Sequence, residues 1–359
     1  MRNLATIQKI ENEFPIEGKD RIVLATMENL GWQVIVQKEQ IRVGDRVVYI
    51  EIDSVLPDKP EFEFLKDKRI RTMKMAGVRS EGICFSIDIL PSGQYNIGDD
   101  VTDIIGIKQY ERTMDKESVN ANSDTKSKKY PKFLMKYKWF RNLVLTKKES
   151  KGFPGFISKT DETRIQSAPF YLNAKAKWVE TEKIDGQSGT FCLVKHKSKF
   201  PFLKDKFEYI VCSRNLRIFE KDKSSYWSVS DRYDIEKVLH TIIGEMDWVA
   251  IQGECVAPGV QKNKYKVDRP DLYVFNVIYP SGRIGSVEAK SIVEQNGMKF
   301  VPIVNKEMEL PDSIDSILEH VTHKSEIGDT LREGSVFRSM DGKLSFKAVS
   351  PAFLIKYKE

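Results

Sequence analysis

Residues 31–52 read GWQVIVQKEQIRVGDRVVYIEI, and this stretch decides the fold of the first third of the chain. Two short apolar runs rich in β-branched residues, 31–37 and 46–52, flank the turn residues 43–45, which predicts two strands. Residues 69–74 alternate in character and predict another strand, with both of its arginines on one face. Several short strands within about 100 residues are typical of a small barrel, and the OB-fold has the matching size.

The sequence after residue 153 mixes helical and strand patterns. Apolar residues at helical spacing predict amphipathic helices at 235–243 and 314–321, the second closed by Gly328. Helices and strands do not alternate regularly, so an α+β fold is favoured over a doubly wound sheet. Strand-like runs occur at residues 189–194, 248–252, 272–278 and 344–349.

At 359 residues and 41.4 kDa the chain is too long for one ordinary core and suits two domains. We expect an α+β multidomain protein with an all-β unit at 1–112, a linker at 113–152 and an α+β unit at 153–359. The net charge is +6. Residues 1–112 carry a net charge of about −3 and residues 113–152 a net charge of about +7, so the positive excess lies in one stretch. Its lysines alternate with aromatic residues, which suits phosphate pairing and base stacking, or equally a solvated connector that packs on a neighbouring domain.

Composition excludes several classes of protein. Hydrophobic residues make up 40% and charged residues 31%, which excludes wholesale disorder. No apolar run is long enough for a transmembrane helix, and Met1–Ala5 begin no signal peptide, so we expect an intracellular protein that contacts no membrane. We expect it in the cytoplasm, and the nucleus stays an alternative. The four cysteines form no C-x-x-C pair, which indicates a reducing compartment. His320 and His323 are neighbours on a predicted helix, and we expect both to be solvated.

One lysine-centred motif, Glu182-Lys-Ile-Asp-Gly186, is followed in order by four further short segments. As a set they resemble the motifs of the covalent nucleotidyltransferases, which include DNA ligases, RNA ligases and mRNA capping enzymes. The four segments are Ser213-Arg-Asn215, Gly253-Glu254, Glu333-Gly-Ser-Val336 and Ser345-Phe-Lys347.

The match extends beyond the short motifs. Residues 179–186, 253–263 and 271–275 resemble RNA ligases in particular. Residues 22–26, 47–57 and 96–107 resemble the N-terminal OB domain of RNA ligase family five. The resemblance thus covers nearly the whole chain apart from the linker, and it implies an OB nucleic-acid-binding domain followed by an adenylyltransferase domain.

The resemblance implies a covalent lysine–AMP intermediate, formed when the Lys183 amine attacks the α-phosphorus of ATP. A free lysine has a pKa near 10.4, so the neutral amine costs about 4.6 kcal/mol at pH 7. A nearby cation or desolvation lowers that cost. A divalent metal, Mg²⁺ or Mn²⁺, also neutralises charge on the phosphate oxygens and takes oxygen ligands. Asp185, Glu254 and Glu333 supply carboxylates from three distant segments.

The remaining roles also follow from the resemblance. Glu182 matches the position that reads the adenine amino group, and Arg214 matches the arginine for the ribose and 5′-phosphate end. Phe275 fits the aromatic ring that stacks on adenine, although within Tyr-Val-Phe-Asn-Val it could belong to the core. Arg164 and Lys347 are expected to neutralise phosphate charge. Gly186 is expected to let the turn after the lysine form tightly.

One departure from the family pattern concerns the last motif. Related ligases have two lysines two residues apart, but here Lys347 is followed by Val349. Lys343, expected four residues earlier on the same strand face, or Lys356 downstream could compensate. No further motif follows before Glu359, and this argues against DNA ligases and capping enzymes, which continue into a C-terminal OB domain.

The sequence therefore predicts an ATP-dependent RNA ligase that joins 3′-OH and 5′-phosphate ends, at nicks in RNA-containing duplexes. Its partner is RNA or such a duplex, and no obligate protein partner is inferred. A DNA ligase, a GTP-using capping enzyme and a nucleic-acid-binding protein with a decayed catalytic half remain alternatives. The intact Lys183, Asp185, Glu254, Glu333 and Lys347 speak against decay.

Overall fold

The structure is a computed structural model, and it describes residues 3–65, 67–110, 152–198, 204–219 and 224–358. The basic linker predicted at 113–152 lies outside these ranges, except for Gly152. Within them, no helix combines the length and the apolar character that a membrane span requires. Cysteines Cys84, Cys192, Cys212 and Cys255 are all free thiols.

The described chain forms two compact units, each assembled from separate segments. The first comprises 3–110, 162–184 and 302–358, and the second comprises 152–161 and 185–301. Both are built mainly from antiparallel sheets with few helices, which confirms the α+β class. The units do not follow the sequence division at 112 and 153, and those domain boundaries stay a prediction.

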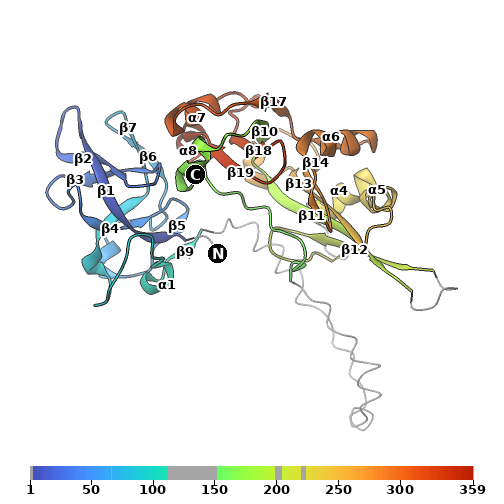
Figure 1. Cartoon of the computed structure of the whole chain (residues 1–359), viewed down its shortest axis with the longest axis horizontal. Coiled ribbons are helices and arrows are strands. Elements are labelled where there is room, and N and C mark those ends of the chain that lie inside the picture. Colours follow the sequence, from blue (N-terminus) through green and yellow to red (C-terminus); the bar gives the residue numbers. More distant parts are fainter. Residues whose placement is uncertain (1–2, 66, 111–151, 199–203, 220–223, 359) are drawn as a thin grey trace, which may run out of the picture. The chain divides into compact units, whose positions relative to one another are not determined.

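A five-stranded antiparallel sheet in the order β3-β2-β1-β4-β8 forms the N-terminal barrel, drawn in blue in Figure 1. Strands β2 and β3 bury alternate residues, whereas β4 buries the four consecutive residues 47–50. Trp32 and Phe62 belong to the same core. The two strands predicted within 31–52 are β3 and β4. The strand bounds are Ala5–Ile16 (β1), Lys19–Met27 (β2), Gln33–Gln37 (β3), Arg46–Ile50 (β4) and Ile83–Ser86 (β8).

Smaller elements complete the barrel. The strand predicted at 69–74 is correct only in part, because β6 begins at Thr72. The residues just before β6 pair with another segment. The Ile70 N–H donates to Ser54 O at 2.8 Å, and the backbone of Arg69 forms an isolated antiparallel β-bridge with Val55. The bounds are Ser54–Val55 (β5), Thr72–Met75 (β6), Val78–Glu81 (β7), Thr102–Ile105 (α1) and Lys108–Gln109 (β9).

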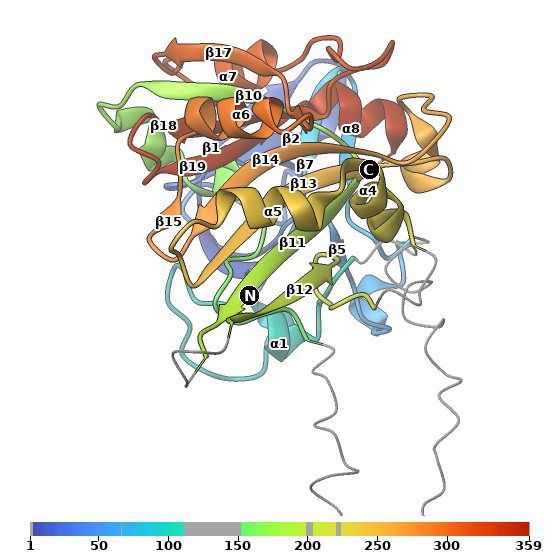
Figure 2. The same ribbon diagram turned by 90° about the vertical axis from the view of Figure 1, so that its right-hand side faces the viewer.

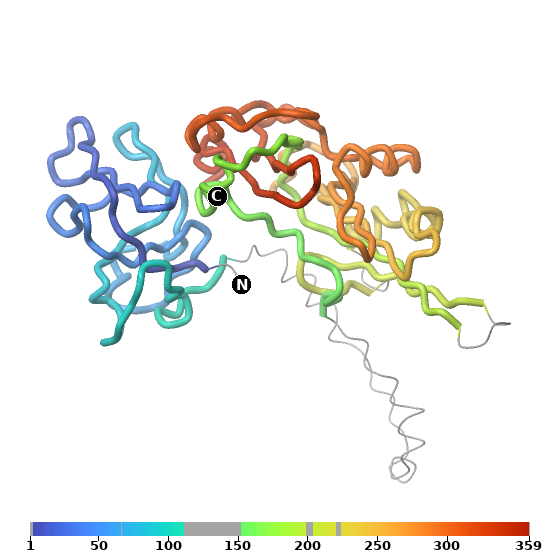
Figure 3. Tube along the Cα trace, viewed as in Figure 1, coloured from blue at the N-terminus to red at the C-terminus, as the bar shows by residue number. Residues whose placement is uncertain are grey.

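The other part of the first unit is a four-stranded sheet in the order β17-β10-β18-β19. In Figure 3 the green trace of β10 runs beside the red trace of β18, although the two are far apart in the sequence. Trp178, Phe337 and Phe346 fill its core, with the two phenylalanine rings stacked at 4.9 Å. The elements are Trp178–Lys183 (β10), Ile303–Met308 (β17), Ile314–His320 (α7), Gly334–Ser339 (β18), Ser345–Val349 (β19) and Pro351–Tyr357 (α8).

Helix α7 corrects one sequence expectation. It ends at His320 with Val321 as its cap, so Gly328 lies beyond the helix and does not close it. An irregular segment follows the cap, and in it the backbones of Lys324 and Leu331 form an isolated antiparallel β-bridge.

The second unit is a larger sheet in the order β12-β11-β13-β14-β15, with β16 paired in parallel to β14. Helices α4, α5 and α6 pack against this sheet (Figure 2). The predicted helix at 235–243 is α5. The bounds are Gln187–His196 (β11), Lys206–Cys212 (β12), Ser225–Tyr233 (α4), Ile235–Ile242 (α5), Trp248–Val256 (β13), Asp271–Tyr279 (β14), Gly282–Arg283 (β15), Ser286–Gln295 (α6) and Lys299–Phe300 (β16).

Candidate active site

Lys183 is the last residue of β10 and lies opposite Gly334, the first residue of β18. Its Nζ donates a hydrogen bond to Glu333 Oε2 at 2.6 Å, although the two residues are 150 positions apart. The Lys183 side chain is 25% exposed and that of Glu333 only 10%. The strand pairing thus brings the predicted nucleophile and one predicted carboxylate into direct contact, on a partly exposed strand end.

Gly334 allows this arrangement because β19 passes very close to it. A Cβ atom at this position would lie 2.1 Å from the carbonyl oxygen of Ala348 and 2.8 Å from Val349 Cα. Both neighbours are backbone atoms, so they could move away only if strand β19 itself shifted. A residue without a side chain is therefore required between the carboxylate of Glu333 and strand β19.

Lys347 and Arg164, the two predicted phosphate-binding cations, also come together in the first unit. The Lys347 N–H donates to Thr163 O at 2.8 Å, and Arg164 forms a parallel bridge with Lys347. The Arg164 guanidinium pairs with Asp53 of the barrel at 3.1 Å and is 7% exposed. Its Nε and Nη1 find no hydrogen-bond partner in the described part of the chain. Two donors of this buried cation are thus left for an anion.

Two lysines could supply the second cation of the last motif, and their surroundings differ. Lys343 precedes β19, so it is not on that strand; its side chain pairs with Asp341 at 3.5 Å and is 81% exposed. Lys356 lies on α8 with its Nζ 5.2 Å from the centre of the Tyr357 ring. Lys343 therefore does not share a strand face with Lys347, contrary to expectation.

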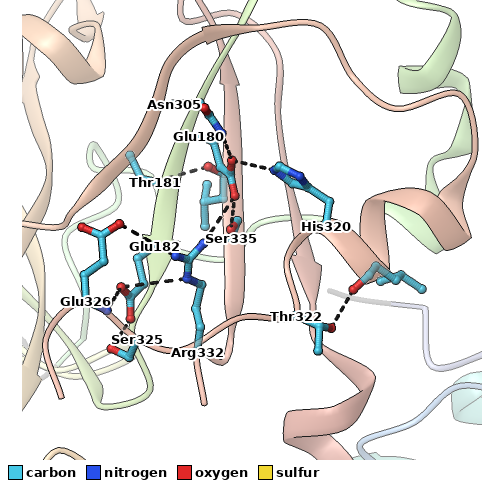
Figure 4. Close-up of polar contacts among 12 residues, drawn as sticks. Glu180, Thr181, Glu182, Asn305, His320, Thr322, Ser325, Glu326, Arg332 and Ser335 are labelled. Atoms are coloured by element: carbon cyan, nitrogen blue, oxygen red, sulfur yellow. Dashed lines mark hydrogen bonds and ion pairs between the residues drawn. The ribbon is translucent and has the colours of Figure 1, made fainter. Parts of the chain in front are cut away.

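Glu182 faces away from Lys183, as alternation along a strand requires. Its carboxylate accepts hydrogen bonds from Ser325 Oγ and from the Glu326 N–H, the latter at 2.9 Å (Figure 4). Burial raises the pKa of this carboxyl, and the hydrogen bonds only partly oppose that effect. In this structure the carboxylate is occupied by protein donors, and its predicted role with adenine stays a prediction.

His320 is expected to be solvated, but its side chain is only partly so, at 33% exposed. Its Nε2 lies 2.9 Å from Glu180 Oε2, and Glu180 is fully buried on β10 (Figure 4). This contact could not be predicted from local patterns, because Glu180 lies 140 residues away in the chain.

In the second unit, the backbone of the Asp185-Gly186 pair donates hydrogen bonds to two different side chains. The Gly186 N–H donates to Glu254 Oε1 at 3.0 Å, and the Asp185 N–H donates to the Tyr265 hydroxyl at 2.8 Å. Glu254 is carried by β13 opposite Ser188 of β11. Glu254 is thereby held against the residue that follows Asp185, on the segment between β10 and β11.

Lys264 is a site residue that sequence reasoning missed. It forms an ion pair with Asp185 in which the side chains are only 4% and 2% exposed. The neighbouring Gln261 Nε2 donates to Gly186 O at 3.0 Å. The family-like segment 253–263 ends one residue before Lys264, and continuing it by one position would have included the lysine.

Phe275 lies at a β-bulge. Gln252 of β13 pairs with Asn276 of β14, and Gly253 pairs with Val274, so Phe275 is the extra residue. Bulges re-aim side chains and are frequent next to active sites. Phe275 is half-buried rather than fully enclosed in the core.

Arg214 lies on the loop after β12. Its Nη2 donates to Asp161 Oδ1 at 2.5 Å, and both side chains are more than one-third exposed. The nearby Lys159 Nζ donates to Asn215 Oδ1 at 3.0 Å. The loop thus presents an accessible arginine held by a surface ion pair.

Within the ranges that the structure describes, no three His, Cys, Asp or Glu side chains are gathered so as to hold a metal ion. Asp185 and Glu254 belong to the second unit and Glu333 to the first, and the predicted metal role of these three stays a prediction.

A family model described as RNA ligase matches residues 176–358, and one described as an OB-fold domain matches residues 4–87. Among solved structures, Naegleria gruberi RNA ligase with PPi is 29% identical, with a TM-score of 0.78 over 100% of this chain and 99% of that chain. A mutant of that ligase with ATP and Mn is 29% identical, with a TM-score of 0.79 over 100% of both chains. Another mutant, with AMP and Mn, is 28% identical, with a TM-score of 0.78 over 99% of each chain. No curated protein matches the chain.

Proposed function

The chain belongs to the RNA ligase family, and on that premise we propose that it is an ATP-dependent RNA ligase that works through a lysyl-AMP intermediate. Similar solved structures of an RNA ligase hold ATP, AMP, PPi and Mn, which supports ATP as the nucleotide and a divalent metal as cofactor. We expect the substrate to be a 3′-OH and a 5′-phosphate end at a nick in an RNA-containing duplex.

The reaction proceeds in three steps. The Lys183 amine attacks the α-phosphorus of ATP, forming the N–P bond as the bond to pyrophosphate breaks. AMP then passes from the lysine to the 5′-phosphate of the nucleic acid. Finally the 3′-OH attacks that activated phosphate and AMP leaves.

The contact between Lys183 and Glu333 is the observation that carries this proposal. It joins two motif residues from opposite ends of the family match at 2.6 Å, with the lysine partly exposed. A carboxylate at this distance fixes the direction of the amine and also stabilises its charged form. The amine becomes nucleophilic once its proton is lost, so the charge of Glu333 must be balanced by another group when ATP binds.

The carboxylates of Asp185, Glu254 and Glu333 supply the donor chemistry that Mg²⁺ or Mn²⁺ takes. Mg²⁺ keeps several waters and is usually held by one or two carboxylates together with substrate phosphates. A cage of three protein acids is therefore not required. When bound, the metal neutralises charge on the phosphate oxygens.

Arg164 and Lys347 act on the same phosphates. Within the described ranges, the Nε and Nη1 of Arg164 have no hydrogen-bond partner, and they are suited to donate to phosphate oxygens because a guanidinium holds its donors in a fixed plane. The barrel then serves as the surface for nucleic acid beside the nick, by analogy with OB-folds that bind oligonucleotides.

Incubation with α-labelled ATP and Mn²⁺, followed by a denaturing gel, tests the first step. We expect wild-type protein to retain label and Lys183→Ala to retain none. Lys177→Ala is the matched control, because Lys177 lies just before β10 and pairs with Glu309 at the surface. Label on Lys183→Ala protein would contradict the proposal.

Two further arms separate the related activities. Labelled GTP in place of ATP identifies a capping-type reaction, and we expect no adduct. Nicked duplexes with RNA or DNA on each side of the nick then identify the sealing substrate. Efficient sealing of an all-DNA nick would contradict the assignment to RNA.

A further inference from the structure

A network of charged and polar side chains lies on one face of β10 (Figure 4). We call Glu180, Glu182, His320, Arg332 and Ser335 the back-face cluster. Glu180 and Glu182 point to this face because they alternate with Thr181 and Lys183 along the strand. Their side chains have no exposed surface. Two carboxylates are thus removed from water directly behind the predicted nucleophile.

Neutral donors satisfy much of the hydrogen-bonding capacity of Glu180. Ser335 Oγ donates to Glu180 Oε1 at 2.6 Å, and Asn305 Nδ2 donates to Glu180 Oε2. The Nε2 of His320 lies 2.9 Å from the same Oε2. Neutral hydroxyl and amide donors hold a carboxylate in place, but they do not cancel its charge, so a buried cation is still needed.

Arg332 is placed to cancel that charge. Its Nη1 lies 3.6 Å from Glu180 Oε1 and its Nε lies 4.0 Å from Glu182 Oε2, while its own side chain is 5% exposed. The Nε forms no hydrogen bond within the described ranges. Arg332 therefore acts on the two glutamates mainly through its charge rather than through directed hydrogen bonds.

Arg332 and Glu182 are the chain neighbours of the catalytic pair. Glu182 precedes Lys183, and Arg332 precedes Glu333. On one face of the strand Lys183 bonds to Glu333, and on the other Glu182 faces Arg332. Residues 182–183 and residues 332–333 are thus joined by a pair of opposite charges on each face of the strand. In the strand register, Glu182 lies opposite Ser335 of β18.

We propose that Arg332 is a positioning residue for lysine adenylylation: it neutralises Glu180 and Glu182 behind β10 and so holds Lys183 and Glu333 in register. The proposal rests on the proposed function. Without Arg332, two buried carboxylates would repel each other and draw water or neighbouring donors between β10 and the segment before β18. The end of β10, with its lysine, would then shift relative to Glu333.

The test measures the rate and the KM for ATP of label transfer into the protein for Arg332→Met. We expect the rate to fall about 10- to 100-fold with little change in KM, because a displacement of about 1 Å at a reacting group costs on that order. Arg332→Lys should retain most of the rate, since a point charge is sufficient. Arg332→Met combined with Glu180→Gln should recover part of it, because one uncompensated charge is gone.

Arg79→Met is the matched control. Arg79 Nε lies 3.0 Å from Oε2 of the fully buried Glu81 on the barrel, so its loss also removes the cation that is paired with a buried glutamate. We expect a loss of stability without a loss of adenylylation rate. This control separates the general cost of an unpaired buried carboxylate from an effect on the lysine.

Three outcomes would overturn the proposal: a wild-type rate for folded Arg332→Met, a change confined to KM, or a loss that neither Arg332→Lys nor Glu180→Gln relieves. If Arg332→Met does not fold, Arg332→Lys decides, and loss of adenylylation in that folded variant overturns the proposal. Failure of wild-type protein to take up label would instead contradict the proposed function itself, so the two failures are distinguishable.

Discussion

A side chain at position 186 would collide with the backbone of the neighbouring strand. A Cβ there would lie 2.4 Å from Cys255 O and 2.9 Å from Glu254 Cγ. We therefore expect Gly186→Ala to destabilise the protein by about 1–3 kcal/mol, as overpacking does, and to weaken the hydrogen bond from the Gly186 N–H to Glu254. Thermal unfolding and label transfer from ATP measure the two effects.

Gly155→Ala is the matched control for that substitution, because nothing lies within 4 Å of its Cβ position. It should leave both stability and label transfer close to wild type. Equal behaviour of the two variants would mean that the turn after Lys183 can open at no cost.

At the scale of single residues, the sequence was most informative where chemistry restricts the choice of residue. Lys183 and Glu333 could be predicted to lie in one site, because the resemblance assigned both to one reaction. Lys264 and Arg332 could not, because each is a buried cation that compensates a nearby acid, and their spacing in the chain carries no signal of burial. Such pairs are defined only by the packing of distant segments.

At the scale of elements, the loop that carries Arg214 is closed by a pH-sensitive ion pair. Glu208 of β12 accepts a hydrogen bond from Arg217 Nη1 at 2.8 Å. At the base of the loop, the backbones of Cys212 and Arg217 form an isolated antiparallel β-bridge. The hydrogen bond from Arg217 lowers the pKa of Glu208 below its ordinary value of 4.5. The stabilisation is therefore fully present above pH 4.5 and is lost as the pH falls through the lowered pKa.

Glu208→Gln tests this expectation. The free energy of unfolding of wild-type protein should exceed that of the variant at pH values above 4.5, and the difference should shrink on acidification. Denaturant titrations at a series of pH values measure it. A difference that is independent of pH would show that the carboxylate charge does not support the loop.

Elements were predictable where the apolar spacing is strong. Helix α5 was found because Ile235, Val238 and Leu239 follow helical spacing, and all three are buried. Helices α4 and α6 could not be predicted in this way, because each mixes polar residues into its buried face. In α6, for example, buried Ser286 and Ala289 share that face with Val293. Helix α8 could not be predicted either, because its seven residues bury only Phe353 and Leu354.

At the scale of the first unit, the barrel is joined to the four-stranded sheet in ways that the sequence division at 112 and 153 does not anticipate. Val349 at the end of β19 and Leu354 on α8 are part of the barrel core. Trp32 Nε1 of the barrel donates to Ser167 Oγ at 3.1 Å, and that hydroxyl donates to Glu51 Oε1 at 3.1 Å. A C-terminal helix that fills an N-terminal core leaves no local sequence pattern.

This shared core predicts that the barrel and the four-stranded sheet unfold together. Leu354→Ala should cost about 2–5 kcal/mol, the usual range for a large-to-small change in a core. Hydrogen exchange measured by mass spectrometry should then quicken in peptides from β1 and β2 as well as in peptides from β18 and β19. Leu318→Ala, in the core of the four-stranded sheet, is the matched control and should quicken the same peptides. Faster exchange confined to α8 after Leu354→Ala would mean that the helix rests on the barrel without coupling it to the strand that carries Lys347.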